Sequence, residues 1–107
     1  MEMANYILSI LRSQLMVVLS WGFNSPRAIE NGLQFHVQGF LFKGVVKVIY
    51  DEGADTFIVR LEKYDGSLWM EQNDVYLDNL VYVIDGMVER TPDYGERVAK
   101  EYGLKEA

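Results

Sequence analysis

The chain has 107 residues, is 50% hydrophobic and carries a formal net charge of −6. This length fits one domain, 1–107, with enough apolar residues for one buried core. Cysteine is absent, which excludes disulfides, thiolate metal sites and thiol nucleophiles.

The first segment has the periodicity of a helix. The apolar residues that recur at helical spacing are Ala4, Ile7, Leu8, Leu11 and Leu15, and we expect this helix to end at Ser13 or Gln14.

We expect the apolar stretch from Ile7 to Leu19 to be neither a membrane span nor a signal sequence. Polar residues interrupt it, and it is shorter than the roughly 20 residues that a span requires. Glu2 stands where a signal peptide carries Lys or Arg. We therefore expect a cytoplasmic protein with no membrane partner.

Two short segments follow. The run from Leu15 to Trp21 contains a β-branched pair and favours a buried strand, while periodicity alone leaves a continuing helix open. Asn24-Ser25-Pro26 has the form of a helix start, and Asn31-Gly32 has the form of a stop. A short connecting helix is predicted between them.

From Leu33 the apolar period becomes two, which indicates strands. Leu33, Phe35 and Val37 share one face. Near Gly39 or Gly44 the apolar residues change from odd-numbered to even-numbered positions, so the pattern fits either two strands or one bent strand. After this change the apolar set is Phe40, Phe42, Val46, Val48 and Tyr50.

A hairpin is predicted around the acidic segment Asp51–Asp55, with Phe57, Val59 and Leu61 facing inward on its second strand. A second turn at Tyr64–Ser67 leads to a short strand around Leu68–Glu71.

The last part of the chain returns to helical spacing. Leu77, Leu80, Val81, Ile84 and Val88 form one stripe. Thr91-Pro92-Asp93 has the form of a helix start, and a final short helix that ends at Gly103 is predicted. The predicted fold is α+β, an antiparallel sheet of four to five strands with the N-terminal helix and the C-terminal helices packed on one face.

Five short segments carry a resemblance to known proteins: Ser20-Trp-Gly-Phe23, Gly39–Gly44, Asp74-Val-Tyr-Leu, Ile84-Asp85 and Val88-Glu89. In these segments the chain resembles small uncharacterised single-domain proteins of anaerobic gut bacteria and their mobile elements. The resemblance implies a helix–sheet–helix layout and a bacterial origin, and it implies no chemistry.

No catalytic, cofactor or metal motif is recognised. His36 is the single histidine, and between Gln34 and Gln38 it fits a solvated strand face better than a catalytic role. Gly39 and Gly44 lack the Lys-Ser or Lys-Thr of a phosphate loop. The acidic segment lacks the ligand spacing of an EF-hand. We therefore predict no cofactor, no metal and no catalytic residue.

Charge is the most informative feature. Residues 51–78 hold eight acids and two bases, while the remainder is neutral. Such a surface repels nucleic acid and steers basic partners, and its solvated acids also keep a sheet soluble. The predicted interaction residues in this segment are Asp51, Glu52 and Asp55.

Val45, Ile49 and Ile58 are apolar residues expected on the face of the sheet away from the helices. An uncovered apolar cluster favours an interface, so we predict a homodimer through this face or through an edge strand.

Three functions remain open. The favoured one is a protein-interaction or regulatory domain whose partner is unidentified. The second is a nucleic-acid mimic that occupies a basic DNA-binding protein. The third is an enzyme or ligand-binding domain that uses carboxylates with tyrosines such as Tyr50, Tyr64 and Tyr82.

Overall fold

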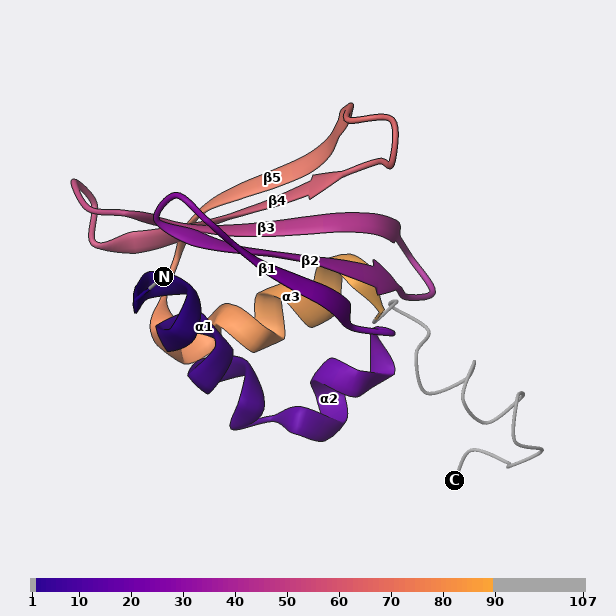
Figure 1. The fold of residues 1–107 in the computed structure, drawn as a ribbon, viewed down its shortest axis with the longest axis horizontal. Helices are drawn as coiled ribbons and strands as arrows, with labels where there is room; N and C mark the ends of the chain where they lie inside the picture. The colour runs from indigo at the N-terminus through magenta and orange to yellow at the C-terminus, as the bar shows by residue number, and fades with distance from the viewer. Residues whose placement is uncertain (1, 90–107) are drawn as a thin grey trace, which may run out of the picture.

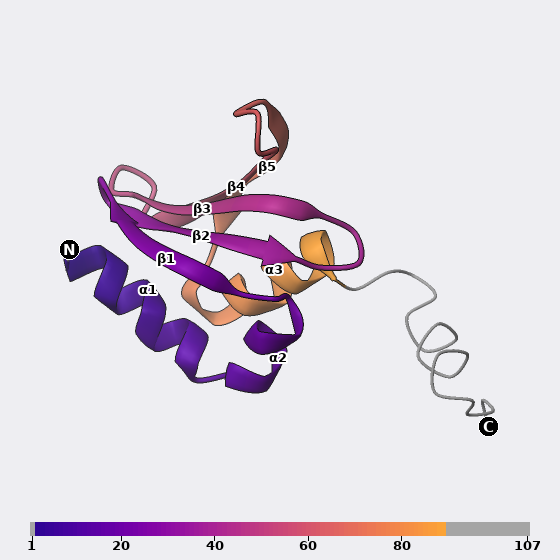
Figure 2. The ribbon, with the colours of Figure 1, turned by 45° about the vertical axis from the view of Figure 1, so that its right-hand side comes forward.

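Two helices, five strands and a third helix follow one another in the computed structural model, which describes residues 2–89 (Figure 1). The helices lie on one face of the sheet (Figure 2), so the predicted α+β fold is confirmed. The elements are α1 (Glu2–Arg12), α2 (Leu15–Ser20), β1 (Asn24–Ile29), β2 (Gly32–Gln38), β3 (Lys43–Asp51), β4 (Thr56–Glu62), β5 (Leu68–Val75), a 3₁₀ turn (Leu77–Asn79) and α3 (Leu80–Val88).

The sheet is an antiparallel meander with the strand order β1-β2-β3-β4-β5. Tyr50 lies opposite Phe57, and Val48 lies opposite Val59. The apolar residues of β4 are buried as predicted, because alternate side chains point to the helices. β5 runs to Val75 and is longer than the predicted strand.

The core lies between the inner face of the sheet and the three helices. Trp21 and Phe35 stack with ring centroids 6.4 Å apart, and both are fully buried. The indole Nε1 of Trp21 donates a hydrogen bond of 2.9 Å to Oδ1 of Asp85, which joins the end of α2 to α3. Burial of each large apolar side chain contributes about 1.5–3 kcal/mol.

The prediction of a strand from Leu15 to Trp21 was wrong, because residues 15–20 form α2. Val18 and Trp21, three residues apart, share a helix face and both reach the core. Tertiary packing therefore outweighs the β propensity of the valine pair.

The predicted connecting helix was also wrong, because its residues form β1. Ser25 has a φ of 55°, and the pairing with β2 is irregular between Asn24 and Arg27. Pro26 fits this edge strand at the irregular position, since no ladder hydrogen bond is lost there. Asn31, with a φ of 54°, belongs to the β1–β2 turn.

Residues 39–42 connect β2 and β3, so the parity change marks two strands rather than one bent strand. Two single-residue expectations were wrong. Phe40, expected with the inward set, is exposed in this turn. Leu77, expected on the helix stripe, lies exposed in the 3₁₀ turn before α3.

The predicted helix between Thr91 and Gly103 lies outside the described residues. Among residues 2–89, no helix has the length and apolar character needed to cross a membrane.

Candidate functional site

Two of the three predicted acidic residues build the turn between β3 and β4. Oδ1 of Asp51 accepts hydrogen bonds from the backbone N–H groups of Gly53 (3.1 Å) and Ala54 (3.3 Å). Asp55 has a φ of 56°, and its Oδ1 accepts a hydrogen bond from the Tyr50 hydroxyl. Glu52 is exposed at the tip of the turn. The structure therefore brings the three carboxylates together and gives two of them structural roles.

Beside this turn lies an open groove with a volume of about 480 Å³, which we call the tyrosine groove. It is bounded by the first turns of α1, the β3–β4 hairpin and the chain after β5, which meet at one end of the molecule (Figure 1). Its lining consists of Met3, Tyr6, Tyr50, Asp55, Phe57, Tyr76, Leu77 and Asp78.

A second depression, here the adjoining hollow, shares Met3 and Tyr6 with the tyrosine groove and has a volume of about 490 Å³. Its other lining residues are Glu2, Asn31 and Glu52. Among the described residues, the two linings carry four carboxylates and no lysine, arginine or histidine. The recess is therefore acidic and aromatic.

The tyrosines of the groove differ in their solvent exposure and in the contacts that hold their side chains. Tyr6 and Tyr76 are 46% and 59% exposed, so each presents a ring surface to solvent. Tyr50 is more covered and packs against Phe57 with ring centroids 5.6 Å apart. Its hydroxyl is oriented by Asp55. One wall is thus fixed, and the rim offers two accessible rings.

The carboxylates of the turn act on the Tyr50 hydroxyl. The hydrogen bond that its hydroxyl donates to Asp55 raises the pKa of Tyr50 above its ordinary value. Partial burial and the negative charges of Asp55, Glu52 and Asp51 raise this pKa further. The field that disfavours a phenolate here favours a cation.

The second acidic turn lies at the opposite end of the sheet (Figure 1). Oδ1 of Asp65 accepts hydrogen bonds from the Ser67 hydroxyl (2.6 Å) and the Ser67 backbone N–H (2.9 Å). These bonds lower the pKa of Asp65, the hydroxyl having the larger effect. The two acidic turns of residues 51–78 therefore lie at opposite ends of the molecule and form no single patch.

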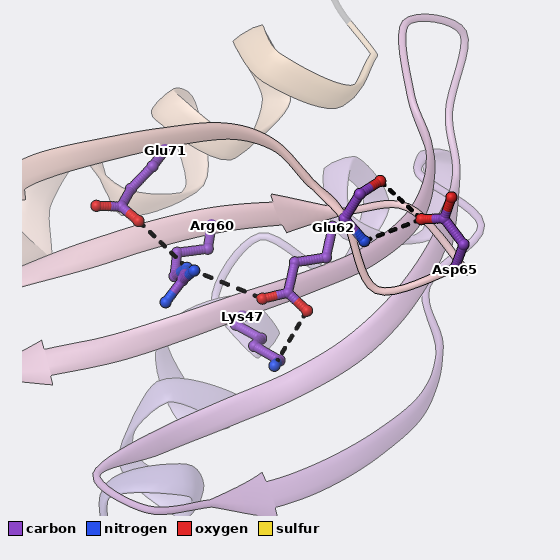
Figure 3. Close-up of polar contacts among 6 residues, drawn as sticks. Lys47, Arg60, Glu62, Asp65 and Glu71 are labelled. Carbon is purple, nitrogen blue, oxygen red and sulfur yellow. Dashed lines mark hydrogen bonds and ion pairs between the residues drawn. The ribbon is translucent and has the colours of Figure 1, made fainter.

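Between the two ends, the outer face of the sheet carries ion pairs (Figure 3). Lys47 Nζ lies 3.1 Å from Glu62 Oε1, and Arg60 Nε lies 3.2 Å from Glu71 Oε2. The buried Nε of Arg60 makes no well-aligned hydrogen bond, so its pairing with Glu71 is mainly Coulombic.

These ion pairs divide the apolar residues of the outer face. Ile49 and Ile58 lie opposite each other on β3 and β4, while Val45 lies opposite Glu62 beyond the charged row. All three are partly covered rather than fully exposed. The homodimer through this face stays a prediction.

The three tyrosines named for a possible enzyme or ligand site do not lie in one site. Tyr50 lines the groove, whereas Tyr64 follows β4 on the other side of the sheet and packs edge-on against His36 at 5.6 Å. Tyr82 is exposed on α3. Among residues 2–89, no group of three or more His, Asp or Glu side chains is placed to hold a metal ion.

Sequence reasoning missed Tyr6, Tyr76 and Asp78 as partners of the acidic turn. Tyr6 is far from the acidic turn along the chain, and so are Tyr76 and Asp78, and only the tertiary fold brings them to the turn at one end of the sheet. No local motif carried that information.

In comparisons with known proteins, no family model, no curated protein and no solved structure matches this chain. The resemblance to proteins of gut bacteria stays a prediction, and function is inferred from the chemistry of the recess.

Proposed function

We propose that this domain is a protein-interaction module that binds a positively charged segment of a partner protein in the tyrosine groove and the adjoining hollow. The observation that supports it most strongly is the lining of the recess, where four carboxylates and three tyrosines meet without a lysine or arginine.

The carboxylates and the tyrosines of the recess both favour a positively charged ligand. Carboxylates attract and steer cationic groups over several ångströms. Tyrosine rings provide rigid contact area at a low cost in side-chain entropy, and they attract ammonium or guanidinium groups through their faces. Tyr6 and Tyr76 are accessible for this purpose.

The charge distribution argues against nucleic-acid mimicry. A mimic of a duplex needs a regular series of unneutralised charges, since phosphates are evenly spaced. Here Glu62 and Glu71 are paired with Lys47 and Arg60, and the remaining acidic turns lie at opposite ends of the sheet.

The proposal is tested by calorimetric titration with a peptide of alternating lysine and glycine, with alternating glutamate and glycine as the negative probe. Two double variants are matched: Glu52→Gln with Tyr76→Ser removes one acid and one exposed tyrosine from the recess, and Asp65→Asn with Tyr64→Ser removes the same groups from the other end. Asp51 and Asp55 are left intact because they hold the turn.

We expect the recess variant to weaken lysine-peptide binding about tenfold, equivalent to about 1.4 kcal/mol, and the distal variant to bind like the wild type. Equal losses in both variants, or equal binding of the glutamate peptide, would contradict the proposal.

A further inference from the structure

Helix α2 presents an apolar surface that nothing in residues 2–89 covers. Leu15, Met16 and Leu19 are 51%, 81% and 55% exposed, and within this six-residue helix Val18 is the one buried residue. No side-chain cap supports its N-terminus. A helix this short depends on packing for its stability, so a covering partner is expected.

The same surface contains an apolar hollow of about 170 Å³ between α1, α2 and β1. Arg12 is its one charged lining residue; the others are Leu8, Leu11, Leu15, Val18, Leu19, Phe23 and Pro26. Small-molecule sites usually measure about 300–1,000 Å³. The hollow is smaller than that range and suits an individual side chain of a docked segment.

The described part of the chain ends at Glu89, which lies beside Ser20 at the end of α2. The last turns of α3 are fixed near the end of α2 by the Trp21–Asp85 hydrogen bond. The Val88 carbonyl also accepts a hydrogen bond of 2.8 Å from the Leu41 N–H. These contacts hold the end of α3, and with it Glu89, close to the end of α2.

The sequence of residues 90–107 contains apolar residues at the spacing of a helix face, which suits the apolar surface of α2. Tyr94, Val98 and Tyr102 recur at every fourth position among charged residues, the spacing that places side chains on one face of a helix. Residues 91–103 in helical form would extend roughly 20 Å at 1.5 Å per residue, enough to run along α2.

We propose that residues 90–107 dock on α2 of the same chain, with Tyr94, Val98 and Tyr102 against Leu15 and Leu19 and one of them in the apolar hollow. Covalent linkage favours this occupant over a second copy, because a short tether holds the segment at an effective concentration of about millimolar.

The absence of cysteine from the chain allows a direct test by engineered cross-linking. The full chain with Met16→Cys and Val98→Cys is compared with the matched pair Met16→Cys and Lys100→Cys, which shifts the second thiol to the opposite side of a helix. Docking predicts that the first pair forms an intramolecular disulfide roughly tenfold faster, since effective concentration sets this rate. Equal rates, or cross-linked dimers as the main product of the first pair, would overturn intramolecular docking.

Amide hydrogen exchange on the full chain without cysteines provides a second test, which does not depend on where the engineered thiols are placed. We expect protection of residues 94–102 in the wild type and its loss in Leu19→Lys, a change at an exposed position that leaves the core intact. Exchange of residues 94–102 at the rate of an unstructured chain in the wild type would overturn the proposal.

Discussion

The Tyr50 hydroxyl donates a hydrogen bond to Asp55 across the β3–β4 turn. This contact links the left-handed backbone at Asp55 to the wall of the tyrosine groove. The acidic turn and the recess are therefore one structural unit, and a change at either residue alters both.

Replacing Asp55 with Asn should lower the pKa of Tyr50 toward its ordinary value. The substitution removes the charge and weakens the hydrogen bond that raise this pKa, while Asn tolerates the left-handed backbone. Tyrosine absorbance across an alkaline titration, with Tyr50→Phe to identify the signal, provides the measurement. An unchanged Tyr50 titration in Asp55→Asn would contradict the assigned cause.

At the opposite turn, Ser67→Ala should raise the pKa of Asp65, because the Ser67 hydroxyl is the main cause of its lowering. A carboxyl with a lowered folded-state pKa stabilises the fold above its ordinary pKa of about 3.9, and this contribution is lost as the pH falls through the folded value. Ser67→Ala should therefore reduce the acid-dependent part of stability. Carboxyl chemical shifts during an acid titration measure the change, and an Asp65 titration identical to that of the wild type would refute it.

Trp21→Phe should destabilise the domain by about 2 kcal/mol or more. The variant loses the hydrogen bond to Asp85 and part of the stacking surface on Phe35, and it leaves the carboxylate without its indole donor. Asp85→Asn keeps an acceptor and should cost about 1 kcal/mol or less. Urea unfolding measures both values; wild-type stability in Trp21→Phe would rule out the proposed role.

Substitution by alanine should destabilise the domain at one loop glycine and have little effect at another. A Cβ at Gly39 would lie 2.3 Å from the Val88 carbonyl oxygen, so Gly39→Ala must displace α3 and should cost more than about 2 kcal/mol. A Cβ at Gly53 would meet its nearest atom, Asp51 Oδ1, at 3.5 Å, and Gly53→Ala should stay within about 0.5 kcal/mol of the wild type. Similar melting temperatures for both variants would show that the close approach at Gly39 carries no cost.

The parts of the fold that could be predicted from sequence are those with long, regular apolar patterns. The spacing of Ile7 and Leu11 predicted α1, and the alternation of Phe57, Val59 and Leu61 predicted β4, because burial of one face repeats with the period of the element. The antiparallel layers followed from the order of these elements.

The predictions failed where local chemistry is ambiguous. Asn, Ser and Pro occur at helix starts and also at irregular edge strands, so the sequence of β1 also fits a helix start. The valine pair at 17 and 18 favoured a strand, and only contacts of Val18 and Trp21 with distant residues make α2 a helix.

The candidate site was predicted in part for a related reason. The excess of acids marked the turn at Asp51–Asp55, but its tyrosine wall depends on long-range pairing. Tyr6 and Tyr76 reach the turn only after the meander has formed.

The central claim is that the recess binds a positively charged segment, and backbone amide chemical shifts of the wild-type domain during titration with the lysine–glycine peptide test it most directly. We expect shifts concentrated at Met3, Tyr6, Glu52, Tyr76 and Asp78, and their loss at about 1 M salt, where the screening length is about 3 Å. Shifts of equal size around Asp65, or no shifts at low salt, would contradict the claim.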